Sequence, residues 1–173
     1  NLTSQGNTSV GFQSLYYNTT GCYNAAVGMY ALHKNTASSN TAMGYGALIC
    51  NTSTGGNAAF GNSALYYNTA SNNTGLGYLS LYSNTTGAEN TAVGSQSLRN
   101  NTTGANNTAV GRCTLYSNLS GSFNIAVGKS AMHSNTTGCF NVAIGRNALF
   151  TNTSGEYNVA VGDGAMLYNT EGT

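Results

Sequence analysis

Residues 90–111 read NTAVGSQSLRNNTTGANNTAVG, so the string NTAVG opens and closes one short stretch of the chain. The glycine that ends each such string recurs along the whole sequence, at Gly11, Gly28, Gly44, Gly61, Gly77, Gly94, Gly111, Gly128, Gly145 and Gly162. Successive spacings are 17, 16, 17, 16, 17, 17, 17, 17 and 17 residues, which makes ten copies in phase. A fixed short period is typical of a repeat architecture, in which each unit packs against its neighbours.

We number each repeat from 1 to 17, starting at its first Asn. Position 4 is large and apolar, position 9 is Leu or Met, and positions 3 and 8 are small. Position 1 is always Asn: Asn7, Asn24, Asn40, Asn57, Asn73, Asn90, Asn107, Asn124, Asn141 and Asn158. Position 12 is also always Asn: Asn18, Asn35, Asn51, Asn68, Asn84, Asn101, Asn118, Asn135, Asn152 and Asn169. The two short copies lack one residue after position 12, in residues 35–40 and 68–73, which marks that segment as a turn.

The composition favours a repetitive fibre over an ordinary globular domain. Charged residues make up 5% of the chain, against about 25% in average domains, and Pro and Trp are absent. The formal net charge is +1, and no basic stripe of the kind that a nucleic-acid surface needs stands out. No apolar run approaches the roughly 20 residues of a membrane helix. We therefore expect neither nucleic-acid binding nor membrane insertion in this span.

The repeat is too short for paired helices, which take about 33 residues, and its Gly and β-branched residues disfavour helix. Two apolar runs, of the NTAVG and xxALY types, favour two short strands per repeat. Stacked at about 4.8 Å, ten such coils predict an all-β parallel β-solenoid, or β-roll, about 48 Å long. Residues 1–173 then form a single repeat array, with coils starting at about residues 7, 24, 40, 57, 73, 90, 107, 124, 141 and 158. Both ends read as turn segments without capping sequence, so we expect a segment of a longer fibre.

Stacking predicts asparagine ladders, because the same position in successive coils lies one strand spacing apart. An Asn above another Asn can hydrogen-bond through the side-chain amides. Asn also tolerates the left-handed backbone of tight turns. Positions 1 and 12 are therefore explained structurally, without a ligand.

Adjacent apolar positions predict partner chains. Positions 3 with 4, and 8 with 9, are neighbours that point to opposite faces if they lie on strands, so one face looks into the coil and the other meets another chain. An aromatic-rich column at position 10 adds to this: Tyr16, Tyr66, Tyr82, Tyr116 and Phe150. The candidate core or interface residues are Val27, Leu32, Val93, Leu98, Val110, Leu115, Val127, Ile144 and Leu149. We predict a homo-oligomer of identical chains, most simply three rolls around one axis; the alternative is a monomeric roll with Ala as a spacer.

The NTAVG strings, and NVAIG at residues 141–145, each closed by Gly, resemble the head repeats of trimeric autotransporter adhesins (YadA-like). They are also similar to shaft repeats of phage and viral tail fibres. The resemblance covers the chain from Asn7 to Asn169, although the repeat is longer than the usual adhesin head unit. It implies left-handed β-rolls assembled as a trimer, in a structural and adhesive fibre on a cell or virion surface. A host-surface or matrix receptor is the partner that it implies.

No catalytic, metal or cofactor site is predicted. The acids Glu89, Glu156, Asp163 and Glu171 fall in turns or on the variable edge of positions 6, 7, 16 and 17. That edge also carries Arg112, Lys129 and Arg146 and is the candidate adhesive edge. His33 and His133 share position 10 but lie six coils apart, about 29 Å, too far to share a metal. We therefore do not expect an enzyme.

The four cysteines are not expected to form intrachain disulfides. Cys22 and Cys139 share a column but lie seven coils apart, while Cys50 and Cys113 occupy different positions in distant coils. A disulfide requires Cα atoms within about 7 Å. Thiols are therefore predicted.

Two surface patterns leave alternatives open. Glycosylation sequons begin at Asn18, Asn51, Asn84, Asn101, Asn135 and Asn152; they either carry glycans or only reflect turn chemistry, since an Asn in an inward ladder cannot carry a sugar. Thr follows the position-12 Asn in nine of ten copies. A regular Thr rank makes an ice-binding β-solenoid the alternative function.

Overall fold

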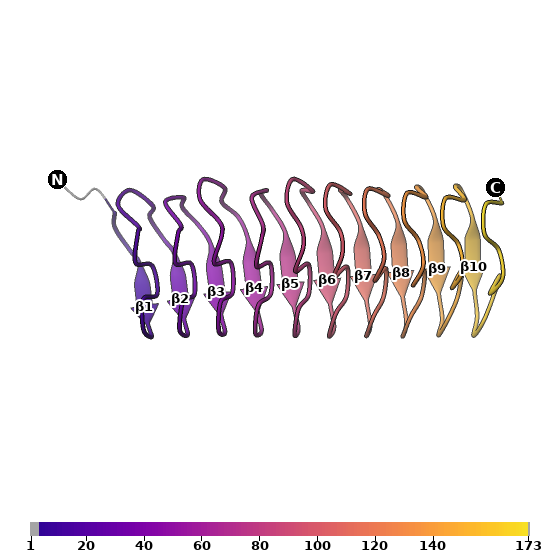
Figure 1. Ribbon diagram of the computed structural model, residues 1–173, viewed down its shortest axis with the longest axis horizontal. Coiled ribbons are helices and arrows are strands. Elements are labelled where there is room, and N and C mark those ends of the chain that lie inside the picture. Colours follow the sequence, from indigo (N-terminus) through magenta and orange to yellow (C-terminus); the bar gives the residue numbers. More distant parts are fainter. Residues whose placement is uncertain (1–3, 173) are drawn as a thin grey trace.

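The computed structural model describes residues 4–172, which contain no helix and form one ten-stranded parallel sheet. The strands lie side by side in chain order, and the first and last coils occupy opposite ends of a rod (Figure 1). They are β1 (Thr8–Val10), β2 (Ala25–Val27), β3 (Thr41–Met43), β4 (Ala58–Phe60), β5 (Thr74–Leu76), β6 (Thr91–Val93), β7 (Thr108–Val110), β8 (Ile125–Val127), β9 (Val142–Ile144) and β10 (Val159–Val161). The predicted parallel β-solenoid is therefore confirmed.

Neighbouring strands pair residue for residue at repeat positions 2, 3 and 4. Ala92 of β6 pairs with Ala109 of β7, and Val93 pairs with Val110. The short coils keep this register, because Ala26 of β2 still pairs with Ala42 of β3. Each repeat position therefore forms a straight column along the rod, with a spacing of about 4.8 Å between coils.

The strand ends at the position-5 glycine for two physical reasons. Gly94 has φ of 128°, a conformation that side chains with a Cβ rarely adopt. A Cβ added to Gly94 would also lie 2.5 Å from the carbonyl oxygen of Gly111 in the next coil. The glycine column is therefore required both for the turn out of the strand and for the close approach of successive coils.

The xxALY segment is not a strand, so the prediction of two strands per coil is wrong. Gln96 and Leu98, at positions 7 and 9, have φ of 60° and 50°, which is left-handed backbone. The Asn101 N–H donates to the Leu98 carbonyl at 3.1 Å, which closes a turn. The Leu98 N–H donates to the Thr114 carbonyl of the next coil at 2.9 Å, so coil-to-coil bonding continues through the turn.

This turn also corrects the burial predicted for positions 8 and 9. Ser97 and Leu98 are both fully buried inside one chain, because left-handed residues break the two-residue alternation of a strand. Positions 3 and 4 do alternate: Ala92 is fully buried, while Val93 is only half-buried. Of these two pairs of positions, the strand pair therefore presents an apolar column to the outside, at position 4.

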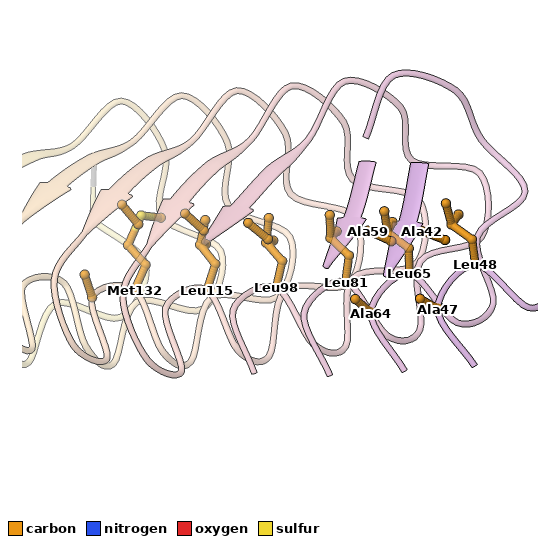
Figure 2. Close-up of a cluster of buried hydrophobic side chains, with 14 of the residues drawn as sticks. Ala42, Ala47, Leu48, Ala59, Ala64, Leu65, Leu81, Leu98, Leu115 and Met132 are labelled. Atoms are coloured by element: carbon orange, nitrogen blue, oxygen red, sulfur yellow. The ribbon is translucent and has the colours of Figure 1, made fainter. Parts of the chain in front are cut away.

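The core is a single file of Leu and Met side chains, one per coil from Leu15 to Leu149, bordered by small residues (Figure 2). Leu32, Leu98, Leu115 and Leu149, which were candidates for core or interface, all belong to this buried file. Ala fills position 3 in most coils and position 8 in many, because the coil is too narrow for a second large side chain. Each buried Leu contributes roughly 2–3 kcal/mol to folding.

We expect Gly94→Ala to destabilise the protein far more than Gly162→Ala. Both glycines have nearly the same backbone, with φ of 128° and 131°, but the Cβ added to Gly162 meets only the Ala165 Cβ, at 3.9 Å. Backbone strain alone costs about 1–3 kcal/mol, and the collision with the Gly111 carbonyl raises the loss for Gly94→Ala above about 4 kcal/mol. Denaturant unfolding followed by circular dichroism measures both; equal losses would contradict the stacking argument.

Candidate functional site

The position-1 asparagines form a continuous ladder inside the coil wall. At each of the nine coil-to-coil steps the backbone N–H of one Asn donates to the side-chain Oδ1 of the Asn one coil earlier, at 2.8–3.1 Å. In six steps the side-chain Nδ2 donates to the same Oδ1 as well, as Asn107 does to Asn90. The asparagine ladder predicted from the repeat is confirmed for this column.

The position-12 asparagines form a second ladder through their side chains alone. Nδ2 donates to the Oδ1 one coil earlier at seven steps, at 2.7–3.3 Å, as in Asn101 to Asn84. The two ladders meet at position 15, where Asn90 and Asn101 both donate Nδ2 to the carbonyl of Gly104 at 2.9 Å. These amides hold the coil wall and its register.

Five of the six sequon asparagines bond within this second ladder, and the sixth, Asn18, donates its Nδ2 to the carbonyl of Gly21. Five of them are fully buried: Asn51, Asn84, Asn101, Asn135 and Asn152; Asn18 is half-buried. A glycan attaches to Nδ2, and the Nδ2 of Asn84 already donates to Asn68 and to the Gly87 carbonyl. The placement therefore favours the interpretation of these segments as turn chemistry.

The threonine rank at position 13 lies on the outer surface of the turn. Six of its hydroxyls donate to the position-13 carbonyl of the next coil, at 2.6–3.2 Å, as Thr85 does to Thr102. These six hydroxyl protons thus bond to the backbone, which gives these six Thr residues a structural role in the stacking.

The outward side chains of positions 2 and 4 form what we call the sheet face. Val27, Val93, Val110, Val127 and Ile144, the remaining core-or-interface candidates, all lie there. Position 4 is apolar in every coil, and Val110 and Ile144 are 36% and 42% exposed. Position 2 changes from mostly Thr and Ala to Ile and Val in β8, β9 and β10. An uncharged, mostly apolar strip therefore follows the rod and becomes more apolar toward its C-terminal end.

Two exposed columns border the sheet face. Column 6 follows each position-5 Gly and consists of Phe12, Met29, Tyr45, Asn62, Tyr78, Ser95, Arg112, Lys129, Arg146 and Asp163. Column 17 directly precedes each position-1 Asn and consists of Gly6, Tyr23, Ser39, Gly56, Asn72, Glu89, Asn106, Phe123, Phe140 and Tyr157. Both change character along the rod, so these columns make one end of the surface chemically different from the other.

Column 6 contains a short basic stripe, which the sequence analysis did not predict. Three of the five basic residues of the chain, Arg112, Lys129 and Arg146, occupy it in successive coils. Arg146 bonds Asp163 in a bidentate pair at 3.0 and 2.8 Å, and this hydrogen bonding lowers the pKa of the exposed Asp163 carboxyl. In column 17, Phe123, Phe140 and Tyr157 stack with centroids 5.1 Å apart and planes within 2°.

The aromatic-rich column at position 10 forms a stack on another side of the coil. The Arg99 guanidinium lies between the Tyr82 and Tyr116 rings, at 5.7 and 5.8 Å from their centroids. His133 stacks between Tyr116 and Phe150, at 5.1 and 5.0 Å. Burial lowers the pKa of the His133 imidazole, because it disfavours the charged ring.

Cysteine and metal chemistry can be described for residues 4–172. Within that range the structure contains no disulfide and no group of three or more His, Cys, Asp or Glu arranged to hold a metal ion. Cys50, Cys113 and Cys139 are thiols, and burial raises the pKa of Cys50. No helix with the length and hydrophobicity to cross a bilayer occurs in the same range, and no pocket opens on its surface.

No family model, curated protein or solved structure matches the chain. The geometry of the columns is therefore the basis for assigning a function.

We expect Asn101→Ala to destabilise the protein by about 2–5 kcal/mol, because it leaves the Asn84 Oδ1 and the Gly104 carbonyl without one buried donor each. Asn62→Ala is the matched control, since Asn62 is exposed in column 6 and accepts one bond from Ser63. We expect this control to change stability by less than about 1 kcal/mol. Denaturant unfolding measures both; similar losses for the two variants would contradict the ladder's role.

We expect His133 to make stability pH-dependent. Its folded pKa lies below the ordinary value of 6.5, so the unfolded chain binds the proton at higher pH than the folded chain. Above pH 6.5 the ring is neutral in both states and protonation does not reduce the free energy of unfolding. Below pH 6.5 the unfolded chain takes up the proton first, so the free energy of unfolding decreases as the pH falls. His133→Phe keeps the stack and removes the titration, so its unfolding midpoint should fall less between pH 7 and pH 5 than that of the wild type. Parallel midpoints for both proteins would rule out this linkage.

Proposed function

We propose that this chain is a structural segment of a homo-oligomeric fibre on a cell or virion surface. Its work is mechanical: it sets a distance, resists unfolding and proteolysis, and presents variable outer positions for adhesion to a surface receptor. The simplest assembly consists of three identical chains around a common axis.

The observation that carries this proposal is the sheet face. An uncharged, largely apolar strip runs along all ten strands of the rod, with side chains such as Val110, Ile144 and Val161 exposed to solvent in the single chain. Soluble monomers rarely expose contiguous apolar patches larger than a few hundred Å², and larger ones mark interaction sites. A partner that covers this strip must match a period of about 4.8 Å over the same length. A second copy of the chain meets that condition without further adjustment.

The mechanical part of the proposal is supported by the way in which the coils are joined. Parallel pairing of β1 to β10, the two Asn ladders and the Thr hydroxyls all connect each coil to the next. Force along the rod is then shared among several hydrogen bonds at each step. Repeat arrays of this kind extend by addition of coils without a change in cross-section.

We expect light scattering to give the purified 173-residue chain the mass of an oligomer, at least twice the 17.7 kDa of one chain. The simplest expected value is three times that mass, a trimer. Val110→Lys should dissociate the assembly, because it places a charge in the middle of the sheet face. Thr103→Lys is the matched control: it adds the same charge at an exposed turn position of a nearby coil and should leave the mass unchanged.

Electron microscopy of the same material should show rods with rotational symmetry about their long axis. A wild-type protein that is monomeric at micromolar concentration would overturn the proposal.

A further inference from the structure

Columns 6 and 17 lie at opposite edges of the sheet face, so they cannot contact each other within one chain. Ser39 and Tyr45 flank β3 (Thr41–Met43), for example, with five residues between them. Extended backbone covers about 20 Å over the six steps from Ser39 to Tyr45. Any relation between the column 6 and column 17 residues that flank one strand therefore reflects something other than contact inside the chain.

The two columns carry their aromatic residues beside different strands. Three aromatic residues of column 6 flank the same strand as small or short residues of column 17: Phe12 with Gly6, Tyr45 with Ser39, and Tyr78 with Asn72. At the C-terminal end the aromatic residues lie in column 17, and column 6 carries charged residues. Met29 and Tyr23 flank β2 as two large apolar side chains, and a thioether packs well against a ring edge.

Two basic residues of column 6 are matched to column 17 by chemistry instead of size. Lys129 and Arg146 flank the same strands as Phe123 and Phe140. Those rings stack face to face at 5.1 Å, which leaves their edges to point outward. The long apolar stems of Lys and Arg can cover such edges while the charged ends stay in water.

The basic stripe repels itself along its own column, because its charges lie about one strand spacing apart. In residues 4–172 the one ion pair is Arg146 with Asp163, so Arg112 and Lys129 receive no such compensation within the chain. Packing against the aromatic residues of column 17 of another chain gives the Lys129 stem a favourable contact.

We infer that column 6 of one chain packs against column 17 of a second copy, with the two chains parallel and in register coil for coil. The inference rests on the proposed homo-oligomer and adds its geometry. Because each contact joins two different edges, every chain offers one edge of each kind, and repetition of the contact gives a ring of parallel chains when the rotation between neighbours divides a full turn, as a third of a turn does in a trimer. The sheet faces then line the inside of the ring. A two-fold axis perpendicular to the rod would instead bring each column against itself.

Disulfide trapping tests this arrangement in the 173-residue chain with Cys22, Cys50, Cys113 and Cys139 replaced by Ser. The matched variant carries Ser39→Cys and Tyr45→Cys, which flank the same strand, β3. The register control carries Ser39→Cys and Tyr78→Cys, two coils apart, which is about 10 Å along the rod. Each single substitution alone serves as a control for chance contacts. Mild oxidation is followed by non-reducing electrophoresis and by light scattering.

We expect the matched variant to become a covalently closed oligomer that reducing agent dissociates. The register control and the single variants should stay at the mass of one chain in denaturing gels. Their cross-linked fraction should be at least tenfold lower than that of the matched variant. If all variants assemble by light scattering and the matched pair does not cross-link, or the register control cross-links equally, this geometry is overturned and the fibre proposal stands. If none assembles, the fibre proposal itself fails.

Discussion

The distance between successive coils is the constraint on which the structure depends. Parallel pairing places every residue about 4.8 Å from its counterpart in the next coil, so each repeat position faces itself along the rod. Where the backbone turns sharply next to the following coil, at position 5, only Gly fits: a Cβ on Gly94 would collide with the Gly111 carbonyl. The constancy of that glycine is a consequence of stacking, since every coil meets the same neighbour.

Hydrogen bonding carries an unusual share of the stability, because the coil is too narrow for a large apolar core. The core has one large side chain per coil, such as Leu98 or Leu115, with small residues around it. The remaining buried positions of the wall are polar and include Asn101 and Asn107. A buried amide without partners costs about 1–3 kcal/mol, so a shift in register that placed Asn against another residue type would be penalised at every coil. The ladders thus fix the register between coils and also contribute to the stability of the fold.

The sequence predicts the fold well wherever the stacking constraint fixes residue type. The period, the parallel strands at NTAVG and the Asn ladders all follow from identity at a repeat position. The left-handed turn at positions 7 and 9 does not follow from residue identity. Leu98 has φ of 50°, whereas Leu ordinarily prefers a negative φ. Left-handed backbone costs roughly 1–2 kcal/mol for such a residue, and complete burial of the side chain offsets that cost. The sequence contains one weak indication of this left-handed turn. Position 7 is Gly in two coils, at Gly46 and Gly164, and other residue types occupy it elsewhere.

The functional surface is harder to predict, because it depends on which residues point outward. Val93 and Leu98 are both aliphatic residues that follow a small residue in the sequence. Val93 nevertheless lies on the sheet face and Leu98 in the core. The basic stripe, in contrast, follows from the repeat. Arg112, Lys129 and Arg146 share position 6 and are 17 residues apart in the sequence, so the stacking that aligns the asparagines also aligns these three residues.

The two short coils show why deletions fall where they do. Ala37 and Ala70 supply the carbonyl that Gly104 supplies in a full coil, and they accept from Asn35 and Asn68 at 2.7 Å. Asn40 and Asn73 then bond the position-12 Asn of the preceding repeat directly, at 3.1 Å. The wall therefore closes with one residue fewer, while β3 and β5 keep their register. A deletion in the turn leaves the sheet face and its two bordering columns on an unbroken spacing, which is the condition for identical rods to pack along their whole length.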